Sequence, residues 1–160
     1  MEKTLIRPYR PEDLDDVVAL VRELQGHDAA RFDRSLPVDA IGPWYVEALL
    51  KACGETRGAL LVAERAAALV GYAAVMCVVA SEDIDDVAYT YAKVSDLLVA
   101  ARFRGQGIGR QLLDACEQRA RAAGARWLRI TAMAGNARAR DAYERFGFRD
   151  LLVDMEKPLD

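Results

Sequence analysis

Glycine residues with arginines on both sides carry the most specific chemistry in this 160-residue sequence. An apolar run that ends at Val99 is followed by the segment 104–109, which reads RGQGIG, and by a periodic segment over 111–123. This order predicts a strand, a glycine-rich turn and a helix. Glycine has no Cβ, so backbone N–H groups can approach a ligand closely, and the helix N-terminus adds free N–H groups and a positive dipole end. The segment is therefore suited to bind phosphate.

Length and composition limit what such a site can serve. A chain of 160 residues that is 52% hydrophobic predicts one domain with a substantial core. The net charge of -3 and the pI near 5.3 argue against nucleic-acid and membrane partners. No apolar run has the length of a membrane span, and no signal-peptide core opens the chain, so we expect a cytoplasmic protein. A single histidine and three widely spaced cysteines predict buried free thiols and no metal site.

Hydrophobic periodicity predicts the elements that must position the glycine turn. The expected strands cover 4–7, 59–63, 69–79, 87–99, 127–131 and 148–155, and the expected helices run from 11 to about 26, over 44–53, from 111 to about 124 and over 137–146. The runs over 59–63 and 69–79 form a hairpin, and their near-continuous apolarity means that helices must cover both faces of the sheet. The segment 27–43 has no clean period.

Three pieces in this order resemble the GNAT superfamily of acetyl-CoA-dependent N-acetyltransferases. They are the strand DLLV that ends at Val99, the loop 104–109 and the segment 136–148, which reads NARARDAYERFGF. The resemblance implies a single N-acetyltransferase domain over 1–160 with an α/β (α+β) GNAT fold, a central mixed and mostly antiparallel sheet of six to seven strands flanked by about four helices. It also implies acetyl-CoA as cosubstrate and no metal. Dimers are frequent in the family, so a homodimer is one expected partner state.

The resemblance also assigns roles to individual residues. Backbone groups of Leu98 and Val99 would hydrogen-bond the pantetheine arm as though it were an added strand. The residues expected to cradle the pyrophosphate, chiefly through N–H groups, are Arg104, Gly105, Gln106, Gly107, Ile108, Gly109 and Arg110. Asn136 would contact the cofactor arm, or serve only as a helix N-cap. Tyr143, about two helical turns further on, falls where the family places the general acid that protonates the leaving thiolate, although a core tyrosine is the commoner role.

The implied reaction is direct attack of a neutral primary amine on the thioester, with backbone N–H groups near Leu98 or Val99 holding the oxyanion. Many family members carry a glutamate immediately before the aspartate that corresponds to Asp96, but here that position is Ser95, which cannot take a proton at ordinary pH. Asp96 should point to the other face of a regular strand, unless a bulge re-aims it. The base therefore stays open between Asp96, water and four further side chains, His27, Glu82, Asp85 and Asp86.

The acceptor also stays open on the sequence. Either a small-molecule or a peptide amine fits, including aminoglycosides, polyamines, amino acids and protein N-termini. Two other functions remain as alternatives. One is a catalytically silent acyl-CoA-binding or sensor module of the same fold, which Ser95 permits. The other is a nucleotide-binding protein, but the loop lacks a Gly-Lys-Ser/Thr ending and its glycine spacing misses the dinucleotide fingerprint.

Overall fold

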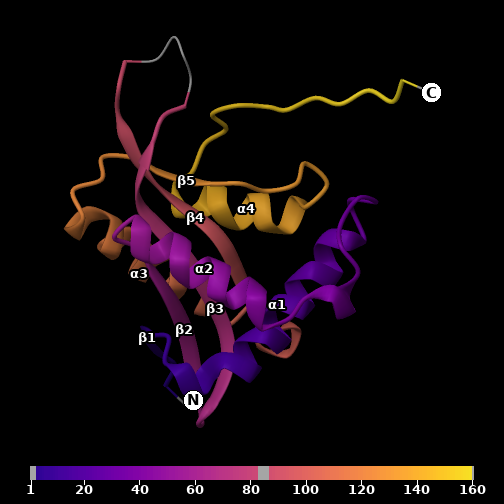
Figure 1. Cartoon of the computed structure of the whole chain (residues 1–160), viewed down its shortest axis with the longest axis vertical. Coiled ribbons are helices and arrows are strands. Elements are labelled where there is room, and N and C mark those ends of the chain that lie inside the picture. The colour runs from indigo at the N-terminus through magenta and orange to yellow at the C-terminus, as the bar shows by residue number, and fades with distance from the viewer. Residues whose placement is uncertain (1–2, 83–86, 160) are drawn as a thin grey trace.

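The computed structural model describes residues 3–82 and 87–159. Five strands within these residues form one sheet. The strands lie side by side in the order in which they follow one another along the chain (Figure 1). They are β1 (Leu5–Pro8), β2 (Ala59–Arg65), β3 (Ala68–Ala80), β4 (Thr90–Val99) and β5 (Leu128–Ile130). Neighbours are antiparallel except β5, which runs parallel to β4. The mixed, mostly antiparallel α+β class is confirmed, although the described residues form five strands rather than six or seven.

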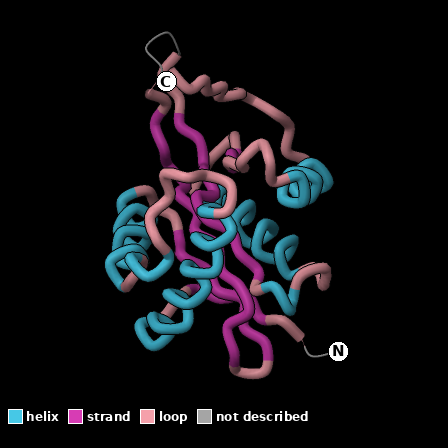
Figure 2. Tube along the Cα trace, turned by 90° about the vertical axis from the view of Figure 1, so that its right-hand side faces the viewer, coloured by secondary structure: helices cyan, strands magenta, loops and turns pink. Residues whose placement is uncertain are grey.

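Four α-helices flank the sheet, as expected, and they cover both of its faces (Figure 2). They are α1 (Leu14–Ala29), α2 (Pro43–Glu55), α3 (Ile108–Ala122) and α4 (Ala137–Phe146). The first two helices pack on one face, and α3 packs on the other face together with aromatic side chains of α4. Within the described residues, no helix is both long enough and apolar enough to cross a membrane.

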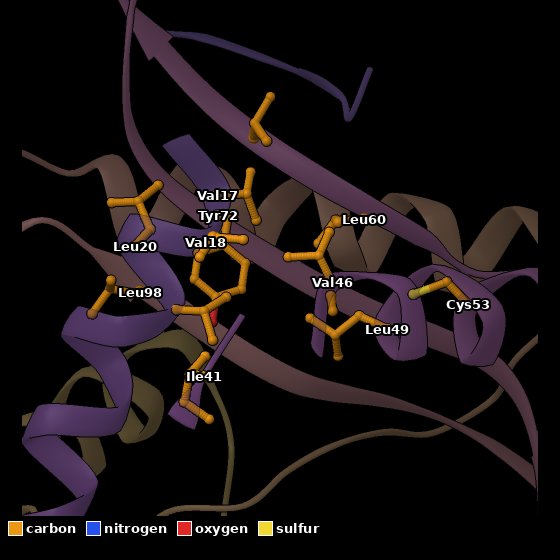
Figure 3. Packing of buried hydrophobic residues seen from close by; sticks show 13 residues of the cluster. Val17, Val18, Leu20, Ile41, Val46, Leu49, Cys53, Leu60, Tyr72 and Leu98 are labelled. Atoms are coloured by element: carbon orange, nitrogen blue, oxygen red, sulfur yellow. The ribbon is translucent and has the colours of Figure 1, made fainter. Parts of the chain in front are cut away.

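Tyr72 lies at the centre of the core between the sheet and α1 and α2. Its side chain is fully buried among residues such as Val17, Val46 and Leu98 (Figure 3). On the other face, buried side chains of α3 pack against β2, β3 and β4. The three cysteines are free and buried, as the sequence predicts. β4 thus lies between two cores, one beneath α1 and α2 and the other beneath α3.

Most boundaries differ from the sequence-based expectation by a few residues, and one expected strand is absent from the described residues. The first helix continues past Gly26 to Ala29, and the second passes through Gly54 to Glu55. A single glycine weakens a helix by only about 1 kcal/mol, so neighbouring packing overrides it. The predicted last strand over 148–155 is wrong, because these residues form no strand and run as an extended loop beyond α4 (Figure 1).

Candidate active site

The two neighbours of β4 separate along its length. β5 pairs only with Ala92–Val94, whereas β3 continues to pair with β4 as far as Val99. The segment 95–99 of β4 therefore has a strand on one side and an open backbone edge on the other. An extended ligand could add to this edge as a further strand.

Alternation of the backbone decides which residues face the open edge. The N–H of Ala100 donates to the carbonyl of Val70 at 2.9 Å, so Ala100 is directed towards β3. Because backbone groups alternate along a strand, Leu98 is directed towards β3 as well, and Leu97 and Val99 present their N–H groups to the open edge. Leu98, expected to offer backbone groups to the ligand, instead uses them within the sheet. Sequence reasoning missed Leu97, whose position follows only once the pairing register is known.

A β-bulge at Ser95 sets the direction of Asp96. The register pairs Asp96 with Ala74 and Val94 with Val75, so Ser95 has no partner across the ladder. Val94 accordingly belongs to the core beneath α3, whereas the Asp96 carboxylate lies on the other face, among side chains of α2 and β3. The exposed Ser95 thus interrupts the alternation that would have held both residues on one face.

Two tyrosine hydroxyls hold the Asp96 carboxylate. Tyr45 of α2 and Tyr72 of β3 each donate a hydrogen bond to Oδ2 at 3.0 Å. Burial raises the pKa of Asp96 above its usual range, and the hydrogen bonds from Tyr72, Tyr45 and the Ser95 side chain offset this only in part. The side chain is only 6% exposed. A buried carboxylate with a raised pKa is a candidate for proton transfer.

A second carboxylate lies within electrostatic reach of Asp96. Asp28 is half-buried near the end of α1, and burial is the main reason that its pKa is raised. The charge of Arg31 lowers this pKa, and the charge of Asp96 raises it further. The charge of Asp28 also contributes to the raised pKa of Tyr143 on α4. The charge of Asp28 is therefore felt by Tyr143, and the charge of Asp96 by Asp28. No sequence signal singled out Asp28, because the segment after Gly26 has no period.

Tyr143 retains its proton over the physiological range. Burial is the main reason that its pKa rises to about 12, and the charge of Asp28 is the lesser one. Its ring packs edge-on against Phe148, with centroids 6.0 Å apart, which orients the side chain. The hydroxyl is therefore available as a proton donor at neutral pH. Seven residues earlier, Asn136 caps α4, accepting a hydrogen bond from the N–H of Ala139 at 3.3 Å through its side chain. The N-cap role is confirmed, while contact with a cofactor stays a prediction.

The glycine turn leaves the N-terminus of α3 open. Gly105 and Gly107 have φ values of 76° and 80°, a left-handed conformation that disfavours other residues. Gly107 is the N-cap of α3 and, having no side chain, leaves the first N–H groups without a side-chain partner. The side chain of Ile108 is buried in the core, so its backbone alone can meet a ligand, whereas Arg110 is exposed at the first turn. This geometry supports anion binding through N–H groups.

Arg104 joins the glycine turn to the open edge of β4. Its Nε donates to the carbonyl of Val99 at 2.8 Å, and Nη2 donates to Glu23 of α1 at 3.1 Å. Nη2 also lies 2.6 Å from Nε2 of His27, which is thereby engaged at this junction. The side chain of Gln106, the remaining polar group of the turn, accepts a hydrogen bond from Arg65 at 2.5 Å.

The remaining base candidates lie elsewhere or outside the described residues. Glu82 is exposed beyond the end of β3, and Asp85 and Asp86 fall within 83–86, which the structure does not describe. Among the residues that it does describe, no group of three or more His, Cys, Asp or Glu side chains is arranged to hold a metal ion.

Comparisons with known proteins identify a family and similar folds. The family model described as the acetyltransferase (GNAT) family matches residues 21–148. The thialysine N-epsilon-acetyltransferase of Mus musculus is 26% identical over 161 residues, covering 94% of this chain and 87% of the relative. A tetramutant of the BH1408 protein from Bacillus halodurans matches with a TM-score of 0.85 and 22% identity, over 97% of this chain and 99% of that one. The aminoglycoside N-acetyltransferase AAC(6')-Iy in complex with CoA matches with a TM-score of 0.76 and 18% identity, over 100% of this chain and 97% of that one.

Proposed function

The chain belongs to the acetyltransferase (GNAT) family, and from this premise we propose that it acetylates a small-molecule primary amine by direct attack within a ternary complex. Acetyl-CoA is the cosubstrate, as in the family. The observation that carries the proposal is the open edge of β4 over 95–99, which begins beside Asp96 and ends at the glycine turn before α3. One extended molecule with a phosphate group at one end and a reactive group at the other fits such an edge.

The cofactor would lie along this edge with its pyrophosphate at α3. The N–H groups of Leu97 and Val99 would bind the pantetheine arm in place of a further strand, and one of them would hold the oxyanion. The pyrophosphate would be held by the N–H groups of Gly105 to Gly109 and by the exposed Arg110. Arg104 sits at the junction, where its guanidinium already donates a hydrogen bond to the carbonyl of Val99. Asn136 would contact the cofactor arm from the start of α4.

The acceptor is inferred to be a cationic amine. Asp28 and Asp96 repel each other enough for the charge of Asp96 to raise the pKa of Asp28. An ammonium group between them would relieve that repulsion, and the two carboxylates could take up its proton before attack. The Mus musculus relative is named for acetylation of the ε-nitrogen of thialysine, which is consistent with an acceptor of this kind.

Tyr143 would complete the reaction as the general acid. The amine nitrogen forms a bond to the thioester carbonyl carbon, the carbon–sulfur bond breaks, and the departing thiolate takes the hydroxyl proton of Tyr143. The nitrogen loses one proton as the amide forms, and this proton returns to the Tyr143 oxygen through solvent, so the products are the amide, neutral CoA thiol and the original tyrosine. The raised pKa of Tyr143, about 12, keeps the hydroxyl proton in place until the carbon–sulfur bond breaks. No acyl-enzyme is needed, which is consistent with three cysteines that are all buried.

The test compares Tyr143→Phe with Tyr91→Phe. Tyr91 is also half-buried, but it lies near the start of β4, away from the open edge over 95–99, and its ring packs against the guanidinium of Arg129 of β5. Free CoA release is measured against a panel of small amines, and acetyl-CoA affinity by isothermal titration. Tyr143→Phe should lower kcat by about 10²–10⁴-fold with acetyl-CoA affinity unchanged, while Tyr91→Phe should behave as wild type.

Two results would contradict the proposal. Failure of the wild-type chain to bind acetyl-CoA would exclude the cofactor site along β4. Binding of acetyl-CoA without turnover on any amine would favour the alternative of a catalytically silent acyl-CoA-binding module.

In addition, Asp28→Asn should raise KM for the amine and leave acetyl-CoA affinity unchanged, since Asp28 is assigned to the acceptor alone.

A further inference from the structure

The Asp96 carboxylate is too enclosed to meet the acceptor amine directly. Its side chain is only 6% exposed and lies between α2 and β3, from which two tyrosines reach it. A base must lie within hydrogen-bond reach of the proton that it abstracts, or be connected to that proton through one intermediate. A proton that travels from an amine to Asp96 therefore has to pass through one of the groups that cover the carboxylate.

The two tyrosines that cover Asp96 differ in their access to solvent. Tyr72 of β3 is fully buried, among side chains such as Ile41 and Leu98 (Figure 3), and its hydrogen bond to Oδ2 is buried with it. Tyr45 of α2 is partly exposed, and its hydrogen bond to the same oxygen, at 3.0 Å, is only partly buried. Tyr45 thus connects the enclosed carboxylate to the outside of the core.

Tyr45 also lies within electrostatic reach of the second carboxylate of the acceptor region. Burial is the main reason that the pKa of Tyr45 is raised, and the negative charges of Asp96 and Asp28 raise it further. The hydroxyl therefore keeps its proton and donates it to Asp96. A donating phenol still has lone pairs on its oxygen, so it can accept a hydrogen bond from an ammonium group held beside Asp28.

The other groups around Asp96 allow the carboxylate to accept a proton. Burial raises its pKa, and the hydroxyl hydrogen bonds, including one from the exposed Ser95, offset this only in part. A raised pKa makes a carboxylate a stronger base. Cys53 of α2 also feels the charge of Asp96, but burial comes first in raising the pKa of this thiol to about 11, so it stays neutral at pH 7.

We propose that Tyr45 is a catalytic residue that relays a proton from the acceptor ammonium to Asp96, an inference that rests on the proposed acetyl transfer. The ammonium nitrogen gives one proton to the Tyr45 oxygen while the Tyr45 hydroxyl proton passes to Oδ2 of Asp96. One N–H and one O–H bond break and two O–H bonds form, which leaves a neutral amine, an unchanged tyrosine and a neutral Asp96. The amine then attacks the thioester, and Asp96 later returns its proton to solvent by the same path.

The pH dependence of turnover distinguishes a relay from a structural role. Tyr45→Phe should lower kcat/KM for the amine by about 10²–10⁴-fold at pH 7, because the amine arrives protonated and has lost its path to a base. Near pH 10 a primary amine is close to its own pKa and needs no base, so the loss should shrink to less than about tenfold. Tyr143 still carries its proton there, since burial raises its pKa to about 12.

Tyr9→Phe is the matched control for Tyr45→Phe. Tyr9 is also partly buried and packs against the same core, but the carboxylates near its hydroxyl do not include Asp96. It should turn over as wild type at both pH values. Asp96→Asn should lose as much activity as Tyr45→Phe at pH 7, and the double variant should be no slower than either single one, because each change removes the same relay.

CoA release measures turnover, and circular dichroism with acetyl-CoA titration establishes that each variant is folded and binds the cosubstrate. Wild-type turnover of Tyr45→Phe at pH 7 would overturn the relay, as would a loss that is equal at pH 7 and pH 10. The relay is also wrong if Ser95→Ala, rather than Tyr45→Phe, shows the loss that alkaline pH restores. If Asp96→Asn does not fold, the pH series of Tyr45→Phe decides alone. A wild-type chain that binds no acetyl-CoA would instead contradict the proposed function itself.

Discussion

Gly71→Ala tests whether the spacing of β3 and β4 supports the cofactor edge. A Cβ placed on Gly71 would lie 2.6 Å from the carbonyl oxygen of Leu98, which is backbone and cannot rotate away. Ordinary contact begins at 3.4 Å, so the two strands would have to part by about 0.8 Å. Overpacking of this kind costs about 1–3 kcal/mol, which for a chain of this length lowers Tm by roughly 2–12 °C.

The same displacement should reach the active site. Leu98 lies between Leu97 and Val99, whose N–H groups face the open edge, so moving its carbonyl misaligns both donors. Loss of one such hydrogen bond, at about 1 kcal/mol, corresponds to roughly a fivefold weaker binding of acetyl-CoA. Urea unfolding measures the stability, and isothermal titration measures the affinity.

Gly54→Ala is the matched control, because a Cβ there has no atom within 4 Å and the residue lies inside α2. It should raise the free energy of unfolding by about 0.5–1 kcal/mol and leave acetyl-CoA affinity unchanged. The reasoning fails if Gly71→Ala is as stable as wild type. It also fails if Gly71→Ala is destabilised but binds acetyl-CoA normally, since the edge of β4 would then not hold the cofactor.

Three further outcomes follow from the same geometry. Burial raises the pKa of Asp96 above 3.8, so the stability that its protonation provides is fully present below that value and is lost as pH rises through the folded-state pKa. Urea unfolding should therefore show that Asp96→Asn loses less stability than wild type between about pH 4 and pH 8. Parallel stability curves for the two proteins would refute this. Gly107→Ala, at φ 80°, should cost about 1–2 kcal/mol and weaken acetyl-CoA binding by titration, and unchanged affinity would remove the pyrophosphate from this turn. No thiol should react with a disulfide reagent before unfolding, and rapid labelling of the native chain would contradict the burial of Cys53, Cys77 and Cys116.

Local patterns in the sequence predicted most of the helices and strands. The glycine turn and the helix over 137–146 were readable because a turn and a cap depend on neighbours in the chain. Strand partners and pairing register depend on residues far apart in the chain, so local sequence patterns could not predict them. Segment 148–155 shows the difference: its alternation predicted a strand, but these residues pair with no strand in the part of the chain that the structure describes.

The position of Asp96 shows the same limit within the active site. Strict alternation along β4 would put Asp96 and Val94 on one face, which is the apolar core beneath α3, where an ionised carboxylate is very costly. The single unpaired residue at Ser95 reverses the face, and Asp96 instead meets Tyr45 and Tyr72. The serine at the expected base position thus coincides with a bulge that turns the next carboxylate towards α2 and β3. Ser95 therefore acts on Asp96 in two ways, through the pairing register and through its own side-chain hydrogen bond, which lowers the pKa of Asp96. Ser95→Ala removes only the hydrogen bond, whereas deletion of Ser95 also restores strict alternation, so we expect the deletion to lower turnover, measured as CoA release, more than Ser95→Ala does.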